Sequence, residues 1–107
     1  MDTLMKRKLF IVYNRAMWKA KSSVDAHKLR QRIRLALGIL QHHEYYVQEK
    51  ALYHPTYYTC SCEDWKYKNT VKRGYRGACK HMIAEVLRER VARMRYQQMD
   101  FLSLGGG

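Results

Sequence analysis

Every cysteine of the chain lies between residues 60 and 81, in the segment CSCEDWKYKNTVKRGYRGACKH. The segment opens with a Cys-x-Cys pair and closes with a Cys-x-His pair. Thiolate and imidazole are the ligands that Zn²⁺ takes in structural sites, where four of them complete a tetrahedral shell. A complete shell leaves no position for water or substrate, so the pattern predicts one structural Zn²⁺ rather than a catalytic metal. The predicted ligands are Cys60, Cys62, Cys79 and His81.

The local structure expected around each pair explains how four ligands reach one ion. Cys60 and Cys62 are expected at the end of a strand, where side chains two residues apart point to the same face. Cys79 is expected at the start of the last helix, where the helix dipole favours thiolate. Zinc is expected to contribute on the order of 10 kcal/mol to folding. We therefore expect the metal-free chain to be largely unfolded between Thr59 and Leu87.

Other roles for these residues remain open. A redox pair usually shows Cys-x-x-Cys beside a βαβ unit, and the sequence has neither. Cys79 and His81 could form a catalytic pair, but nothing marks a group that orients the base, and two cysteines would be unexplained. The cysteines could also be ordinary buried residues. Among the histidines that could replace His81 as a ligand, namely His42, His43 and His54, the best placed is His54.

The elements that must position the ligands are expected to be helices on either side of a β-hairpin. Apolar residues at a three-to-four spacing indicate two N-terminal helices, over residues 4–20 and about 25–40. Residues 43–53 and 55–62 are rich in tyrosine and divided at a proline, which favours two antiparallel strands. A long loop is expected over residues 63–78.

The last helix is expected from Cys79 to about Gln98. The predicted fold is thus α+β: a small zinc-stabilised domain with a β-hairpin and a C-terminal helix, preceded by two N-terminal helices. The predicted organisation is a helical segment over 1–41, a finger with its helix over 42–99, and a tail over 100–107.

The two ligand pairs resemble the SWIM zinc finger, in which Cys-x-Cys and Cys-x-His are separated by a variable gap. The flanking residues agree with that family, since Glu63-Asp64-Trp65 resembles its acidic-aromatic step and Ala84 completes its Cys-x-His-x-x-Ala form. The resemblance covers about residues 44–90. It implies a module that binds DNA or proteins, often beside helicases, transposases or recombination factors, and that is not itself an enzyme.

The composition points to a polyanionic partner. The chain has 107 residues, with 21 Lys and Arg against 9 Asp and Glu, for a net charge of +12. Between the ligand pairs, cations alternate with aromatic residues, a mixture that suits phosphate contact and base stacking. Trp65 is expected instead to pack over the zinc site. The residues predicted to contact nucleic acid are Lys66, Lys68, Lys72, Arg73, Tyr75, Arg76 and Lys80, with Arg30 and Arg34 on the second helix.

The sequence thus predicts a small zinc-stabilised nucleic-acid-binding protein, for DNA or RNA. The alternative is a protein-interaction adaptor in a larger nucleoprotein complex, such as one for recombination or transposition. No paired carboxylates, nucleophile elbow or phosphate-cradling glycine loop is present in the sequence, so we do not expect an enzyme.

The odd number of cysteines argues against a secreted disulfide framework and favours an intracellular location, in the cytoplasm, nucleoid or nucleus. The longest apolar run, Leu9 to Tyr13, is too short to cross a bilayer, and the N-terminus lacks the features of a signal peptide. We therefore expect no membrane partner.

Overall fold

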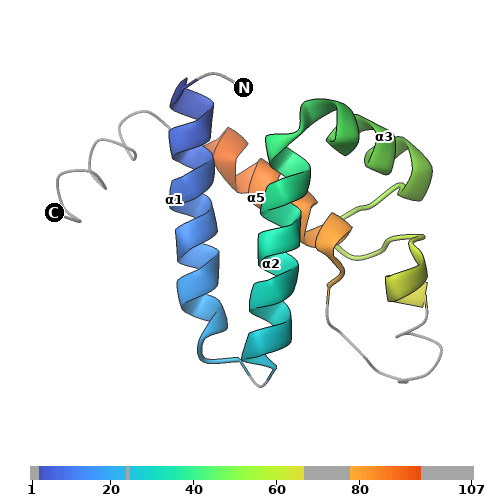
Figure 1. Cartoon of the computed structure of the whole chain (residues 1–107), viewed down its shortest axis with the longest axis horizontal. Helices are drawn as coiled ribbons and strands as arrows, with labels where there is room; N and C mark the ends of the chain where they lie inside the picture. The colour runs from blue at the N-terminus through green and yellow to red at the C-terminus, as the bar shows by residue number, and fades with distance from the viewer. Residues whose placement is uncertain (1–2, 24, 67–77, 95–107) are drawn as a thin grey trace, which may run out of the picture.

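The computed structural model of the chain describes residues 3–23, 25–66 and 78–94. These residues form α1 (Thr3–Ala20), α2 (Ala26–Gln41), α3 (His43–Tyr53) and α5 (Lys80–Arg93), with a further helical turn over residues 63–66. In Figure 1, α1 and α2 run side by side and α5 crosses behind them, while α3 lies beside the end of α5 that carries the last two predicted ligands. Among the described residues, no helix combines the length and apolar character that crossing a membrane requires.

α1, α2 and α5 share one hydrophobic core. Each helix contributes apolar side chains at three-to-four spacing, which places them on one face of that helix. Leu87 of α5 is 1% exposed and lies within this core. The core joins residues on both sides of position 41, the predicted boundary between the helical segment and the finger. Its buried helical residues are Leu9, Val12, Met17 and Ala20 of α1, Ile33, Ala36, Ile39 and Leu40 of α2, Tyr46 of α3, and Ile83, Ala84, Leu87 and Val91 of α5.

The two predicted N-terminal helices are confirmed as α1 and α2, with a break between them at the expected place. The break is a turn in which the Ser23 N–H and hydroxyl both donate to the carbonyl of Ala20, at 3.1 and 3.0 Å. Asp25 then occupies the N-cap of α2. The last predicted helix is confirmed as α5 up to Arg93, and its predicted extension to Gln98 falls, from residue 95 on, outside the described residues.

The prediction of an α+β fold with a β-hairpin is wrong, because the described residues form helices and no strand. The first predicted strand, residues 43–53, is the helix α3. Its early tyrosines favour strands, but residues 48–52 read Gln-Glu-Lys-Ala-Leu, all good helix formers. A long-range contact supports the helix, since the Tyr46 hydroxyl donates to Glu85 Oε1 of α5 at 2.8 Å.

The second predicted strand, residues 55–62, forms a turn and a short irregular segment instead. The chain reverses after α3 at His54, whose φ of 47° lies in the left-handed region common at helix C-termini. Thr56 then closes a turn, donating its N–H to the Thr59 carbonyl at 2.8 Å. The Ser61 N–H donates to the Tyr53 carbonyl at 3.0 Å, so the segment is held to the end of α3 rather than to a strand.

Candidate metal centre

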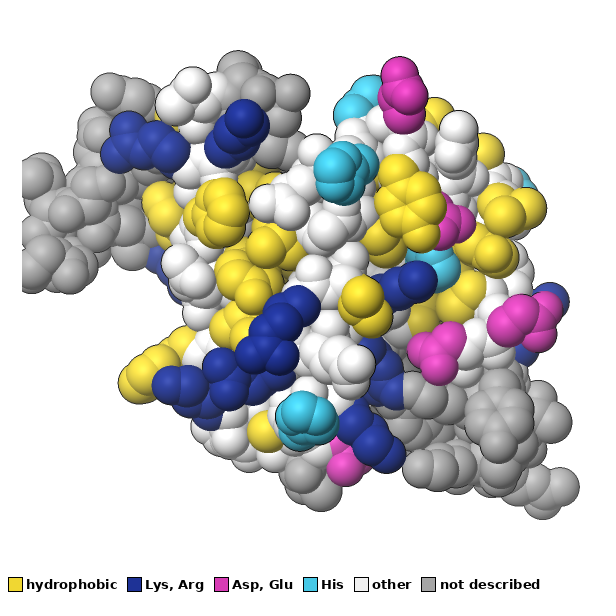
Figure 2. All heavy atoms as spheres, viewed as in Figure 1, with side chains coloured by type: hydrophobic (Ala, Val, Ile, Leu, Met, Phe, Trp, Pro, Cys, Tyr) yellow, Lys and Arg dark blue, Asp and Glu magenta, His cyan; other side chains and the backbone are white. Residues whose placement is uncertain are grey.

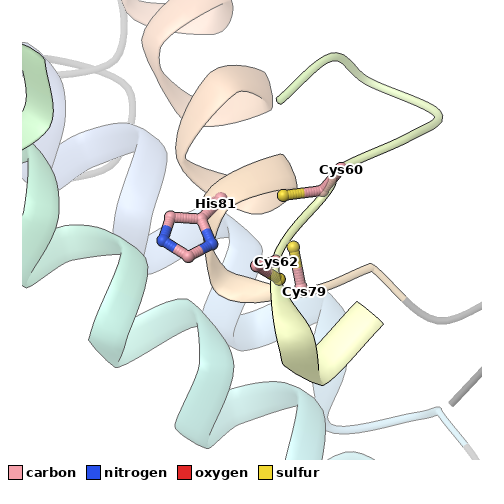
Figure 3. Close-up of side chains that lie close together, drawn as sticks. All are labelled: Cys60, Cys62, Cys79 and His81. Carbon is pink, nitrogen blue, oxygen red and sulfur yellow. The ribbon is translucent and has the colours of Figure 1, made fainter. Parts of the chain in front are cut away.

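The four predicted zinc ligands lie together where the irregular segment meets the start of α5 (Figure 3). The sulfurs of Cys60, Cys62 and Cys79 and a ring nitrogen of His81 all lie within 4.8 Å of one another. A tetrahedral Zn²⁺ with Zn–S bonds of about 2.3 Å places its sulfur ligands about 3.8 Å apart. The observed spacing is therefore that of a site for one metal ion.

Two helix starts deliver these ligands, one from each pair. Cys62 begins the helical turn over residues 63–66, since its carbonyl accepts the Lys66 N–H at 3.1 Å. Cys79 is the N-cap of α5, and its carbonyl accepts the Ile83 N–H at 3.0 Å. The strand expected at Cys60 and Cys62 is absent, but the bend at this point still turns both sulfurs toward Cys79.

Burial controls the electrostatics of the cluster. All four ligands are buried, and the three cysteines are free rather than joined in disulfides. Burial raises the pKa of the Cys79 thiol well above its ordinary value and outweighs the Met82 N–H, which favours the thiolate. Burial likewise raises the pKa of Cys60. The N–H groups at the start of the helix therefore lower the pKa of Cys79, as expected, but by less than burial raises it. A metal must displace protons from these thiols, so its affinity falls as the pH falls.

His81 gives the clearest sign that the cluster holds a metal. Burial lowers the pKa of its imidazole, which favours the neutral form that binds metals. Both ring nitrogens are buried without a hydrogen-bond partner among the described residues, a costly state for polar atoms. One of the two nitrogens faces the three sulfurs (Figure 3). A Zn²⁺ ion bound there satisfies that nitrogen and balances the thiolate charge, so the donor set fits one structural Zn²⁺.

Comparison with known families agrees with this geometry. Residues 58–84 match the family model described as the SWIM zinc finger, and this range contains all four clustered ligands. The chain carries a SWIM zinc finger. No match was found among curated proteins or among solved structures. The match extends into the first turns of α5, whereas α1, α2 and α3 precede it.

The helix α3 supplies outer contacts of the SWIM finger that the sequence analysis missed. The Tyr53 carbonyl accepts hydrogen bonds from the Ser61 hydroxyl at 2.7 Å and from the Cys60 thiol at 3.9 Å, and the Tyr53 ring packs on His81 with centroids 4.8 Å apart. Glu49, one helical turn earlier, places Oε1 3.7 Å from His81 Nε2. The signal was the four-residue spacing of Glu49 and Tyr53, which makes their side chains neighbours in a helix but sets them about 13 Å apart along a strand.

A second set of contacts fixes α3 on α5. Glu85 of α5 accepts the Tyr46 hydroxyl through Oε1, and its Oε2 lies 3.6 Å from the Lys50 ammonium. Burial and this hydrogen bond raise the pKa of Tyr46 to about 12. Because α3 is held at Glu85, its Glu49 and Tyr53 side chains stay over His81. On the sulfur side, Trp65 packs against the cysteines, which is the packing role expected for it.

Four of the residues predicted to contact nucleic acid lie in the described part of the chain, and they are divided between the finger and α2. Lys66 is exposed beside the cysteines, and Lys80 lines a groove with Lys28 and Arg32 of α2. Arg34 is exposed on α2, whereas Arg30 is partly buried there. The predicted contacts that lie outside the described residues are Lys68, Lys72, Arg73, Tyr75 and Arg76. The alternative ligands His42, His43 and His54 are exposed and lie outside the cluster.

We expect Glu49→Gln to lower the Zn²⁺ affinity by about 10- to 100-fold, the usual effect of losing a carboxylate beside a metal-bound histidine. The carboxylate faces Nε2, so it favours the tautomer that leaves the other ring nitrogen free to bind the metal. Competition with a chromophoric chelator measures the affinity. Glu44→Gln, an exposed change in the first turn of the same helix, is the control and should have no effect. Equal affinities for wild type and Glu49→Gln would contradict this role.

We expect removal of Zn²⁺ to expose the amides of residues 55–66 and of the first turn of α5 to hydrogen exchange. The buried side chains of this region, such as Cys60, Cys62 and Met82, belong to the cluster around the ligands, whereas Leu87 and Val91 belong to the three-helix core. Exchange measured with and without excess chelator tests this. Loss of protection as far as Leu87 would instead match the wider unfolding that the sequence predicts. Unchanged protection over 55–66 would show that the metal does not hold the finger.

Proposed function

We propose that this protein is an intracellular, non-enzymatic nucleic-acid-binding module, in which the zinc finger is structural and α1 and α2 supply the anion-binding surface. We call α1 and α2 together the basic layer. The proposal rests mainly on the distribution of charge in the folded chain, which the net charge by itself does not give.

The positive charge of the described residues is concentrated in the basic layer. α1 carries five Lys and Arg and α2 carries four, and neither contains an acidic residue between Thr3 and Ala20 or between Ala26 and Gln41. The other described residues carry seven Lys and Arg against seven Asp and Glu, and so are balanced. Nine cations on two adjacent helices that contain no acidic residue favour a polyanion with closely spaced charges, as nucleic acids have.

The acidic side chains lie on the other part of the molecule. Figure 2 shows Lys and Arg side chains gathered over α1 and α2, and most of the Asp and Glu in view toward α3 and the finger. Several of these acids are engaged, since Glu85 contacts Lys50, Glu49 faces His81 and Glu89 pairs with Arg93 at 2.6 Å. A nucleic acid on the basic layer therefore meets few opposing carboxylates.

The groove between α2 and the finger extends this surface toward the zinc site. It is lined by three cations, Lys28 and Arg32 of α2 and Lys80 of α5, together with Asp64. Lys80 lies between the ligands Cys79 and His81, so the metal fixes its position relative to α2. The finger thus supports phosphate binding by placing a cation at the edge of the basic layer.

We expect Arg34→Gln to weaken binding and to reduce the slope of log affinity against log salt by about 0.9 on duplex DNA, because each phosphate contact releases counterions. Arg34 is exposed in the basic layer. Titration of single-stranded DNA, duplex DNA and RNA at several salt concentrations measures the slopes. Arg93→Gln, which removes an exposed cation already paired with Glu89, is the control and should leave the slope unchanged. No binding to any nucleic acid at low salt would contradict the proposed function.

An adaptor role is the second candidate, and the outer surface of α3 favours it. Tyr45 and Leu52 lie on one side of this helix and are 42% and 63% exposed, and Tyr58 on the neighbouring turn is 83% exposed. Large apolar side chains that remain in solvent often mark protein contacts. These side chains do not line the groove between α2 and the finger, so a nucleic acid in that groove leaves them accessible to a protein.

We expect an adaptor to retain a stoichiometric protein partner from native extract after nuclease treatment, and Leu52→Ser to release that partner. Leu52 is mostly exposed, so the change should not affect folding. Affinity capture followed by quantitative mass spectrometry makes the measurement, with Leu4→Ser, an exposed leucine of α1, as the control. A partner that is lost with nuclease, or that is retained equally by Leu52→Ser, would contradict this role for α3.

A further inference from the structure

Trp18 is the most exposed large apolar side chain of the basic layer. It is 71% exposed on α1, whereas the core face of the same helix holds Leu9, Val12 and Ala20 at 3% exposure or less. A tryptophan in this position adds nothing to the core and is a weaker helix former than alanine. Packing among the described residues does not explain a tryptophan here, so the residues around its ring indicate which kind of ligand the ring contacts.

Those surroundings are cationic and polar. The Lys21 ammonium lies 4.6 Å from the centroid of the Trp18 ring, within cation–π distance. A shallow hollow beside the ring is lined by Asn14, Arg15, Trp18 and Lys19. Arg15 and Lys19 are one helical turn apart and are exposed, so they flank the ring on one surface of α1.

A second aromatic side chain continues this surface. Phe10 is 45% exposed and lies eight residues before Trp18, about 12 Å along the helix axis. Asn14 stands between them at four-residue spacing, so the three side chains form one line along α1. The line therefore offers two aromatic rings and one amide, flanked by cations, without an acidic residue anywhere in α1.

We propose that this line binds single-stranded nucleic acid, with Trp18 as the platform on which an unpaired base stacks. Exposed aromatic rings flanked by Lys and Arg are the arrangement that binds single strands without sequence readout, since every base has a π-face and every nucleotide a phosphate. The bases of a duplex are already stacked on one another and cannot reach a ring on a helix surface. The α1 surface therefore selects single strands, while the cations of α2 bind either form.

A lipid surface is a poorer fit for the same residues. A helix that binds a membrane buries a broad apolar face among the lipids. The apolar face of α1 is already buried against α2 and α5. The large apolar side chains that stay exposed on α1 are interspersed with Lys and Arg rather than joined in a broad face, and they are Leu4, Met5, Phe10 and Trp18. The inference rests on the proposed nucleic-acid-binding function and adds to it a strand preference and a site outside the zinc finger.

The test compares Trp18→Ala and Trp18→Phe with wild type in the zinc-loaded full chain. The probes are fluorescein-labelled oligothymidylate of about twenty nucleotides, which is longer than typical single-strand sites, a duplex of the same length, and phosphatidylcholine vesicles containing phosphatidylserine. Leu52→Ala, which removes an exposed apolar side chain from α3, is the control. Because Trp18 is exposed, both variants should fold, and thermal unfolding checks this.

We expect Trp18→Ala to lower affinity for the oligothymidylate by about tenfold, as loss of one base-stacking contact does. Trp18→Phe should keep most of the affinity, and duplex binding should change by no more than about twofold because the phosphate contacts remain. The salt slope should be unchanged in Trp18→Ala, whereas Lys21→Gln should reduce it by about 0.7 on the single strand.

The outcomes separate this inference from the proposed function. If wild type binds no nucleic acid, both fail. If wild type binds the oligothymidylate and Trp18→Ala binds it equally well, or loses duplex and single-strand affinity in parallel, only the stacking site is overturned. Binding to the vesicles that depends on Trp18, without Trp18-dependent binding to the oligothymidylate, would overturn it in favour of a lipid surface.

Discussion

Three thiols and one imidazole buried within 4.8 Å of one another impose the main constraint on this structure. Without a metal, burial keeps the Cys79 and Cys60 thiols protonated and leaves both nitrogens of His81 without partners. A Zn²⁺ ion reduces both costs together, because it binds the thiolates and one nitrogen in the same shell, while Glu49 faces Nε2 of the imidazole. The position of the irregular segment after α3 and the start of α5 follow from this shell.

α5 transmits that constraint to the rest of the chain. Cys79 is its N-cap and His81 lies in its first turn, while Ala84, Leu87 and Val91 pack in one core with α1 and α2. One rigid helix thus belongs to the metal site at one end and to the three-helix core at the other. The zinc ligands therefore fix not only the finger but also the direction in which the basic layer faces, even though α1 and α2 contain no ligand.

The sequence was sufficient for the parts of the structure that depend on local spacing. The ligand pairs were found from their intervals, and α1, α2 and α5 from apolar residues every three to four positions. Residues 43–53 could not be assigned in this way, because strand-favouring tyrosines and helix-favouring residues adjoin in one short segment. What supports the helix is the hydrogen bond of Tyr46 to Glu85, a residue 39 positions away, and no local pattern reveals such a contact. Because residues 43–53 were assigned to a strand, the contacts of Glu49 and Tyr53 with His81 were not predicted.

The distribution of charge also depends on long-range contacts, because the sequence gives the number of cations but not their positions in the folded chain. A net charge of +12 does not say where the cations lie, and the sequence directed attention to the cation-rich stretch between the ligand pairs. In the folded chain, acids at Glu49, Glu85 and Glu89 face cations or a ligand histidine on the side of α3 and α5. α1 and α2 carry nine cations and no acid of their own, and Asp64 of the finger lies at the edge of α2. The recognisable motif is then the part that holds the fold, and within the described residues the most cationic helices are the two that match no motif. In a small zinc protein this division has a physical reason: a closed, buried metal shell has no free ligand atom to offer a partner, so binding must use the surfaces that the shell positions.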